Sequence, residues 1–379
     1  MAQRVAIVGA GTGGTMVANR LARRMAKDLN SGSLEVMVFS DTSSHFYQPG
    51  FLYVALGLKE PDEIKRPVTQ SFLPGVRVVF DAVTGIDVKR SMVHTAHDNF
   101  SYDYLVLATG SHPDMEALPG FSQGAYSFYT LPEAIRLRQA LLQFQKGKLL
   151  MIVGVPHKCP VAPLEFMLMF EQQLRQRGYR ETVQLQYTYP LGRLHSLEAM
   201  AGWAESVFAE RNIESEVFFN PETIDAENRI VYTLEGEEAS YDLLVGIPPH
   251  RGAPLIRQSG LGDSDGWLPT DRFTLRYKGA DNVYVLGDAT DLPISKAGST
   301  AHYQSDVVVR NLMLQLSGQA PMPLYDGKVF CFVEGGLTQA THITFDYHHP
   351  PVPSSPTEMV HWFKEAFNQL YWSSLRGLI

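Results

Sequence analysis

Residues 4–25 read RVAIVGAGTGGTMVANRLARRM: an apolar strand, a glycine turn and a helix whose apolar residues recur every four positions. Gly9, Gly11 and Gly14 fit the pattern GxGxxG, in which the first glycine allows the turn, the second lets the backbone approach a pyrophosphate, and the third lets the helix pack on the strand. The pyrophosphate would lie at the helix N-terminus, where unpaired N–H groups and the helix dipole favour anions. The stretch therefore predicts an α/β domain that binds a dinucleotide.

The second strand of such a domain is expected to end in an acidic residue that binds the ribose. Here LEVMVFSDTSS (34–44) ends its apolar run at Ser40 and Asp41. Asp41 is the candidate ribose ligand, and Ser40 is its competitor.

Two later segments bear on the choice between FAD and NAD. In YDYLVLATGS (102–111) and NVYVLGDATD (282–291), an apolar strand ends in a small-residue turn, formed by Ala108, Thr109 and Gly110 in the first and by Gly287 and Asp288 in the second. With the N-terminal loop, they resemble the three-part FAD signature of flavoproteins that have two dinucleotide-binding domains and are related to glutathione reductase. The resemblance implies that Asp288 accepts hydrogen bonds from the ribityl chain or phosphate of FAD. The alternative role of a lone strand-end Asp is a helix cap.

The segment after Asp288, LPISKAGSTAHYQSDVVVRNLMLQL (292–316), predicts a helix that begins near Ser299. Its N-terminus would point at the pyrimidine end of the flavin, where negative charge accumulates on reduction. Lys296 is a candidate second cation at that place. The alternative for Lys296 is a solvated loop lysine.

The place for a second glycine loop holds prolines and a cysteine instead. After the apolar strand KLLMIV, the chain reads VGVPHKCPVAPLE (153–165), and no glycine follows Gly154 within the loop. Proline lacks the N–H group that cradles a phosphate, whereas an enzyme that uses NADH would repeat the glycine loop here. We therefore expect a second Rossmann-like half without an NAD(P)H site and a different source of electrons. Cys159 lies in this loop.

Composition narrows the function classes. The 379 residues suggest two or three domains, and the formal charge of −8 without a basic cluster argues against nucleic-acid binding. Because a strand is predicted from Arg4, we expect no signal peptide, and no apolar stretch reaches the length of a membrane span. Two cysteines, Cys159 and Cys331, are too few for a disulfide scaffold or a zinc site, so no metal is expected. Taken alone, scattered cysteines are commonly inert core residues.

Four segments in order, together with the FAD frame, resemble the sulfide:quinone oxidoreductase family and its relative, the flavin subunit of flavocytochrome c sulfide dehydrogenase. They are SHFYQPG (44–50), HKCPVAPLE (157–165), GKVFCFVEGG (327–336) and AFNQLYWSSLRGLI (366–379). The resemblance extends over essentially the whole chain. It implies FAD as cofactor, sulfide and quinone as reactants, and Cys159 facing Cys331 across the flavin as a redox-active disulfide or polysulfide bridge that a sulfide anion attacks.

Two candidate bases accompany the cysteines. Glu165, six residues after Cys159, is a candidate proton acceptor or only a partner of the helix dipole. His195 in PLGRLHS is a second candidate base or a structural histidine. Many family members also carry a third cysteine, in a segment where this chain has Phe128, Tyr129 and Thr130. FAD is therefore expected to be bound non-covalently unless a redox cysteine is used, and both the sulfur product and sulfide as natural substrate stay open.

The tail after Pro350 begins with a proline-rich linker and continues with apolar residues at helical spacing. This stripe forms either a core or dimer face, or a membrane anchor; Trp362 and Trp372, beside Lys364 and Arg376, suit a bilayer interface. Because a quinone is lipid-soluble, we expect a monotopic anchor on the cytoplasmic (plasma) membrane that forms part of a quinone channel, with Phe332 and Phe345 as candidate ring contacts. The membrane face and the identity of the quinone stay open.

The predicted architecture is α/β, with two Rossmann-like domains and a C-terminal membrane and acceptor region. The FAD domain comprises 1–115 and 246–320, the second domain 116–245, and the C-terminal region 321–379. YDLLVGIPPHRGAPL (241–255) mirrors YDYLVLATGSHPD (102–114), as expected if both halves follow one βαβ plan. Three alternatives remain: a flavocytochrome-type subunit that donates to a haem protein, an enzyme like type II NADH dehydrogenase, and a non-catalytic flavin-binding sensor. A homo-oligomer is left open.

Overall fold

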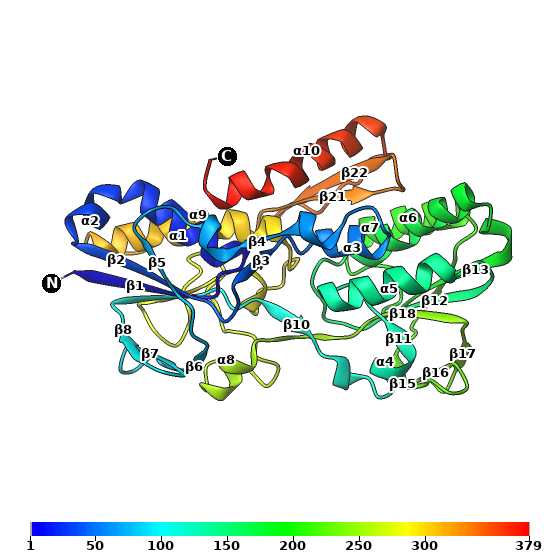
Figure 1. Cartoon of the computed structure of the whole chain (residues 1–379), viewed down its shortest axis with the longest axis horizontal. Helices are drawn as coiled ribbons and strands as arrows, with labels where there is room; N and C mark the ends of the chain where they lie inside the picture. Colours follow the sequence, from blue (N-terminus) through cyan, green and yellow to red (C-terminus); the bar gives the residue numbers. More distant parts are fainter. Residues whose placement is uncertain (1, 379) are drawn as a thin grey trace.

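The computed structural model describes residues 2–378 and contains two five-stranded parallel sheets, one in each half of an elongated molecule (Figure 1). The first sheet has the order β20-β9-β1-β2-β5, and its central strand β1 pairs Val5 with Val36 on one side and with Tyr104 on the other. Its strands are β1 (Gln3–Val8), β2 (Leu34–Phe39), β5 (Val76–Val79), β9 (Tyr104–Leu107) and β20 (Val283–Val285). Helices α1 (Thr12–Arg24), α2 (Ala26–Ser31) and α9 (Gly298–Leu316) belong to this half.

The second sheet repeats the plan with the order β11-β18-β12-β13-β14. Its strands are β11 (Ala125–Tyr126), β12 (Gly147–Val153), β13 (Val183–Tyr189), β14 (Glu214–Val217) and β18 (Leu243–Ile247), and helices α5 (Leu131–Gln143), α6 (Ala162–Arg177) and α7 (Glu198–Glu210) lie over one face (Figure 1). The parallel Rossmann-like units predicted from the sequence are confirmed.

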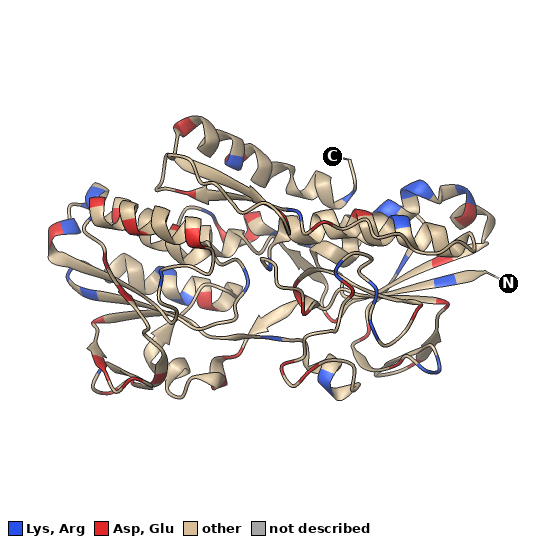
Figure 2. Cartoon of the chain, turned by 180° about the vertical axis from the view of Figure 1, so that it is seen from behind, with Lys and Arg blue, Asp and Glu red and all other residues tan. Residues whose placement is uncertain are grey.

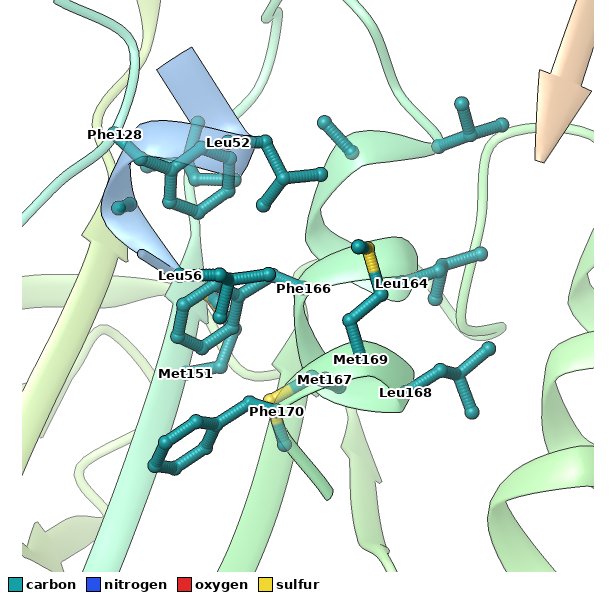
Figure 3. Close-up of a cluster of buried hydrophobic side chains, with 14 of the residues drawn as sticks. Leu52, Leu56, Phe128, Met151, Leu164, Phe166, Met167, Leu168, Met169 and Phe170 are labelled. Atoms are coloured by element: carbon teal, nitrogen blue, oxygen red, sulfur yellow. The ribbon is translucent and has the colours of Figure 1, made fainter. Parts of the chain in front are cut away.

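Helix α6 is the most deeply buried helix of the second half. Every residue from Ala162 to Glu171 is buried, and Phe166 lies beside Leu56, the C-cap of α3 (Gly50–Ala55) (Figure 3). Apart from Glu165 and Glu171 these residues are apolar, and a helical segment with apolar residues on all sides must be covered on all sides. The first turn of α6, which follows the Cys159 loop, is thereby held rigidly.

Matching antiparallel segments in the two halves confirm the internal echo. Each half carries a three-stranded meander, with β6 (Val83–Asp87), β7 (Met92–Thr95) and β8 (Asn99–Ser101) in the first, and β15 (Pro221–Asp225), β16 (Ile230–Thr233) and β17 (Glu238–Ser240) in the second. The two mirrored segments then pair with each other, since β10 (Ser111–Pro113) is antiparallel to β19 (His250–Gly252). This ribbon lies between the two halves (Figure 1).

The C-terminal region bridges the two halves. A ribbon of β21 (Val329–Glu334) and β22 (Ala340–Phe345) leads into α10 (Glu358–Leu375), which lies along the top of the molecule (Figure 1). Asn19 of α1 donates to the Leu375 carbonyl at 2.7 Å, so the end of α10 is bound to the first half. No helix within residues 2–378 has the length and apolar character needed to cross a bilayer.

Shorter elements complete the chain. They are β3 (Ser44–Phe46), β4 (Lys65–Pro67), α4 (Phe121–Gly124), α8 (Pro254–Gln258) and the 3-10 turns η1 (Pro61–Ile64), η2 (Val68–Ser71), η3 (Met115–Ala117), η4 (Arg180–Thr182) and η5 (Gly287–Ala289).

Candidate functional site

The N-terminal glycine loop is closely packed on its protein side and open on the other. Gly9 has a φ of +109°, which L-residues rarely adopt, and a Cβ on Gly14 would collide with the carbonyl oxygen of Gly9. By contrast, a Cβ on Gly11 would meet no atom within 4 Å. The open side faces the N-terminus of α1, as binding of a pyrophosphate requires.

The other two segments of the predicted FAD signature converge on this loop. A Cβ on Gly9 would collide with the backbone of Ala108, and the Ser111 hydroxyl donates to the Asp288 carboxylate at 3.3 Å. The hydroxyl of Thr109 is buried and has no hydrogen-bond partner in the described part of the chain. A buried, unpaired hydroxyl beside an open glycine loop fits a polar cofactor such as FAD.

The residues after β2 separate the two candidate ribose ligands. Ser40 is buried, and its hydroxyl donates to the Thr42 carbonyl at 2.8 Å, whereas Asp41 is exposed. The carboxylate of Asp41 is therefore accessible for the ribose, while the Ser40 hydroxyl is already bonded.

Lys296 is not a solvated loop lysine. Its ammonium donates to the carbonyls of Asp288 (2.9 Å) and Thr290 (2.7 Å) and lies 4.1 Å from the ring centre of Trp267. Burial lowers the pKa of Lys296 to about 8. Its predicted contact with the flavin stays a prediction.

Lys158 carries a second ammonium group near Asp288. It donates to the Gln48 side chain at 2.9 Å and to the Ser111 carbonyl at 3.3 Å; burial lowers its pKa, and the charge of Asp288 opposes that effect. In the sequence, nothing distinguishes Lys158 from a solvated lysine, so sequence reasoning missed it. The structure thus brings cations from both halves to Asp288.

The loop that carries Cys159 is closed. The Gly154 amide donates to Ile247 and the His250 amide to Pro156, both at 2.6 Å, and a Cβ on Gly154 would lie 2.6 Å from Cδ of Pro249. Since the space above Gly154 is filled by protein, this loop lacks the open cradle seen at Gly11.

Cys159 is fixed in an unusual backbone conformation at the end of this loop. Its φ is +50°, its amide donates to the Lys296 carbonyl at 2.7 Å, and its carbonyl accepts from the Ala162 amide (3.0 Å) and the Tyr129 hydroxyl (3.3 Å). Tyr129 lies in the segment for which the family resemblance implies a third cysteine. The tyrosine therefore positions the cysteine loop through its backbone.

Cys331 lies in the middle of β21, and the fold brings it into the electrostatic neighbourhood of Cys159. Both are free thiols and partly accessible. Burial raises the pKa of Cys331 to about 11, and burial, then the charges of Glu165 and Cys331, raise the pKa of Cys159 well above its usual range. Both thiols are therefore held neutral when reduced.

Glu165 belongs to a buried ionic network beside the cysteines. Its carboxylate pairs with Lys364 and accepts from the Glu334 amide at 2.7 Å; the Lys364 ammonium also lies 3.5 Å from the Glu334 carboxylate. Tyr53 donates to Glu334 at 3.0 Å, and His361 Nδ1 lies 3.0 Å from it. Glu165 is thus more than a partner of the helix dipole.

The charges in this network are set by burial and pairing. Burial raises the pKa of Glu165, and Lys364 opposes that effect. Burial alone would lower the pKa of Lys364, but the charges of Glu165, Tyr53 and Glu334 outweigh it and hold that pKa well above its ordinary value. The expectation that Lys364 lies at a bilayer interface is wrong, because it shares the inner face of α10 with Asn368 and Tyr371 and is 7% exposed.

His195 lies behind the cysteine loop. It is fully buried, its Nδ1 accepts from the Leu197 amide at 3.0 Å, and burial lowers its pKa to about 4. His157 has a similarly lowered pKa of about 4, also through burial. Both imidazoles are neutral near pH 7, and the role of His195 as a base stays a prediction.

Two Rossmann-like halves, one with an open nucleotide cradle and the other with a closed cysteine loop in its place, are the features of a flavoprotein of the disulphide-oxidoreductase class. The sequence pattern of that class, Pyridine nucleotide-disulphide oxidoreductase, matches residues 3–305, and the chain belongs to this family. FAD is its cofactor.

Relatives within the family confirm the resemblance to sulfide:quinone oxidoreductases. The chain is 28% identical to the mitochondrial sulfide:quinone oxidoreductase of Mus musculus, over 93% of this chain and 80% of the relative, and 25% identical to that of Dictyostelium discoideum, over 98% and 85%. The solved sulfide:quinone oxidoreductase of Aquifex aeolicus superposes with a TM-score of 0.87, at 22% identity, covering 99% of this chain and 92% of the other. NDH2 from Plasmodium falciparum shares the fold with a TM-score of 0.75, at 12% identity, over 99% of this chain and 96% of the other.

Proposed function

We propose that this protein oxidises sulfide through a redox pair of Cys159 and Cys331 and passes the electrons to a membrane quinone. The observation that carries this proposal is the replacement of the second phosphate cradle by a closed loop bearing Cys159, with Cys331 close by and an open cradle in the other half. The similarity to sulfide:quinone oxidoreductases over nearly the whole chain supports it.

The sulfur chemistry follows from the cysteine pair. In the oxidised pair, HS⁻ attacks one sulfur, a new sulfur–sulfur bond forms, and the bond between Cys159 and Cys331 breaks, which leaves a persulfide on one cysteine and a thiolate on the other. Oxidation of sulfide to zero-valent sulfur releases two electrons and a proton. When bound, FAD accepts the two electrons and passes them to the quinone, which also takes up two protons.

Glu165 is the proposed proton acceptor. It is a carboxylate whose charge acts on both thiols, and Lys364 holds it in place. The network continues through Glu334 to His361, whose side chain is 18% exposed. Because quinone reduction consumes protons that sulfide oxidation releases, we propose that the network carries protons between the cysteines, the quinone and solvent. His195 is the second candidate base.

The outer face of α10 is the proposed membrane contact. Five apolar side chains on this face are 46–71% exposed: Met359, Trp362, Phe363, Phe367 and Leu370. Figure 2 shows few charged residues along this helix. Such a face suits a helix that lies in the bilayer interface. Phe332, next to Cys331, has its ring centre 5.7 Å from that of Phe367, which links this face to the cysteine strand.

We propose that the quinone reaches the site between these elements, with Phe332 and Phe345 as ring contacts. Phe345 of β22 lies opposite Val329 of β21 and is largely buried. We also propose that the chain divides into an FAD domain (1–115 and 246–320), a second Rossmann-like domain (116–245) and a C-terminal region (321–379).

Anaerobic reduction of the flavin tests the proposal. Sodium sulfide is mixed with the FAD-loaded wild type and with Cys159→Ser and Cys331→Ser, and the long-wavelength flavin absorbance is followed; FAD content and the thermal midpoint control for folding. We expect rapid bleaching in the wild type, loss of bleaching in both variants, and reversal by a soluble quinone. Bleaching by NADH but not by sulfide would show a type II NADH dehydrogenase instead.

A further inference from the structure

A cavity of about 720 Å³ lies on the flank of the first half, between η2, β5 and the C-terminal end of α10. None of the glycines of the FAD cradle, and neither of the cysteines, lines it. The cavity is therefore separate from the site described above.

All charged side chains that line the cavity are arginines, Arg66 and Arg376. Neither forms an ion pair with a carboxylate of residues 2–378, although most other arginines near α1 do, as Arg24 does with Asp306. The Arg66 guanidinium lies 4.5 Å from the ring centre of Trp372. Stacking on an aromatic ring orients a guanidinium and leaves its N–H edge available, so the cavity presents unneutralised positive charge.

Ser71 also lies in the wall of this cavity. It is 4% exposed, its hydroxyl has no hydrogen-bond partner within the described chain, and its carbonyl accepts from Asn19 at 2.7 Å, which fixes its backbone. The hydroxyl itself is buried and not open to the cavity, so the two arginines are the groups that can bind a ligand here.

The remaining walls are largely apolar. Phe72 and Val78 line the cavity beside Trp372. A ligand that fills this space thus combines an anionic end with an apolar part. Two guanidinium groups supply more donors than one carboxylate can accept, whereas a phosphate has enough oxygens for both arginines.

We propose that this cavity binds a phosphate group that carries an apolar substituent, with Arg66 and Arg376 holding the phosphate. Two sources share this chemistry: a membrane phospholipid and a soluble phosphate ester. The apolar walls, and the exposed apolar face elsewhere on α10, favour the lipid.

Calorimetric titration of the FAD-loaded full chain distinguishes these sources. The probes are inorganic phosphate and dihexanoylphosphatidylglycerol below its micellar concentration. The variants are R66Q/R376Q and the matched control K27Q/R90Q, which removes two exposed cations that do not line the cavity. We expect saturable binding to the wild type and the control, and a loss of about tenfold or more in R66Q/R376Q. Tighter binding of the short-chain lipid than of phosphate identifies the lipid; binding of phosphate alone identifies the soluble ester.

The inference is overturned if neither probe binds saturably, or if R66Q/R376Q binds as the control does. Should R66Q/R376Q lose FAD or its folded structure, the single variants R66Q and R376Q provide the same test, with weaker binding of both probes expected in each. Sulfide-dependent bleaching is expected to persist in all of these variants, so failure here and failure of the proposed function are distinguishable.

Discussion

Lys364 places a single ammonium between the buried carboxylates of Glu165 and Glu334. Replacement of Lys364 by methionine would leave the buried carboxylates of Glu165 and Glu334 without this ammonium beside them. Removing one partner of a buried ion pair is far more destabilising than removing one of a surface pair, because the remaining charge stays buried.

We predict that K364M lowers the free energy of unfolding by about 3 kcal/mol, measured by urea unfolding of the FAD-loaded protein. The matched control is K59M, which removes the more exposed ion pair between Lys59 and Glu365 (3.9 Å). This change should alter the free energy of unfolding by less than about 1 kcal/mol. The additional change E165Q should restore part of the loss, since it removes one of the two stranded charges. Equal losses in K364M and K59M would contradict the buried network.

The reactivity of Cys331 should follow its raised pKa. In the reduced Cys159→Ser variant, a pKa of about 11 leaves roughly a hundredfold less thiolate at pH 8 than in an exposed cysteine. Alkylation by iodoacetamide should therefore be slow at pH 7 and accelerate about tenfold per pH unit up to pH 10. The same variant unfolded in urea supplies the reference and should level off near pH 9. A plateau below pH 9 in the folded variant would show that burial does not control the thiol.

At the scale of elements, periodicity located α10 but could not orient it. The predicted stripe is split in the structure: Tyr371 and Leu375 are buried, while Phe363 and Phe367 are exposed. Lys364 faces inward because it pairs with Glu165. The two residues lie 199 positions apart in the sequence, so the spacing of residues within α10 could not predict this contact. The glycine loop, by contrast, was predictable because its requirements are local.

The exposed face of α10 should determine membrane binding. We predict that W362S/F363S reduces the fraction of protein that floats with phosphatidylcholine vesicles by about tenfold, because two large side chains no longer enter the interface. The control L142S/L234S removes two equally exposed apolar residues outside α10, 63% and 67% exposed, and should float as the wild type does. Neither change should alter the thermal midpoint. Equal effects of both double variants would indicate general hydrophobic adsorption.

At the scale of the whole molecule, two halves of the same plan have acquired different chemistry at corresponding loops. The first half leaves space above Gly11, whereas the second fills the space above Gly154 with Pro249 and ties its loop to the neighbouring strand. β10 and β19 pair the two halves, and α10 contacts both, so Cys331 in β21 is brought towards Cys159 by the assembly of the halves rather than by either alone.

This asymmetry predicts one nucleotide per chain. The purified protein should contain one FAD, and NADH up to about 1 mM should neither bleach the flavin nor give a saturable calorimetric signal, because Pro156 and Pro160 supply no N–H groups and the loop leaves no open cradle. The same preparation must be bleached by sulfide, which serves as the positive control. Saturable NADH binding with retention of sulfide activity would mean that the second half takes a nucleotide by a route other than a glycine loop, and that cysteine and hydride chemistry coexist in one chain.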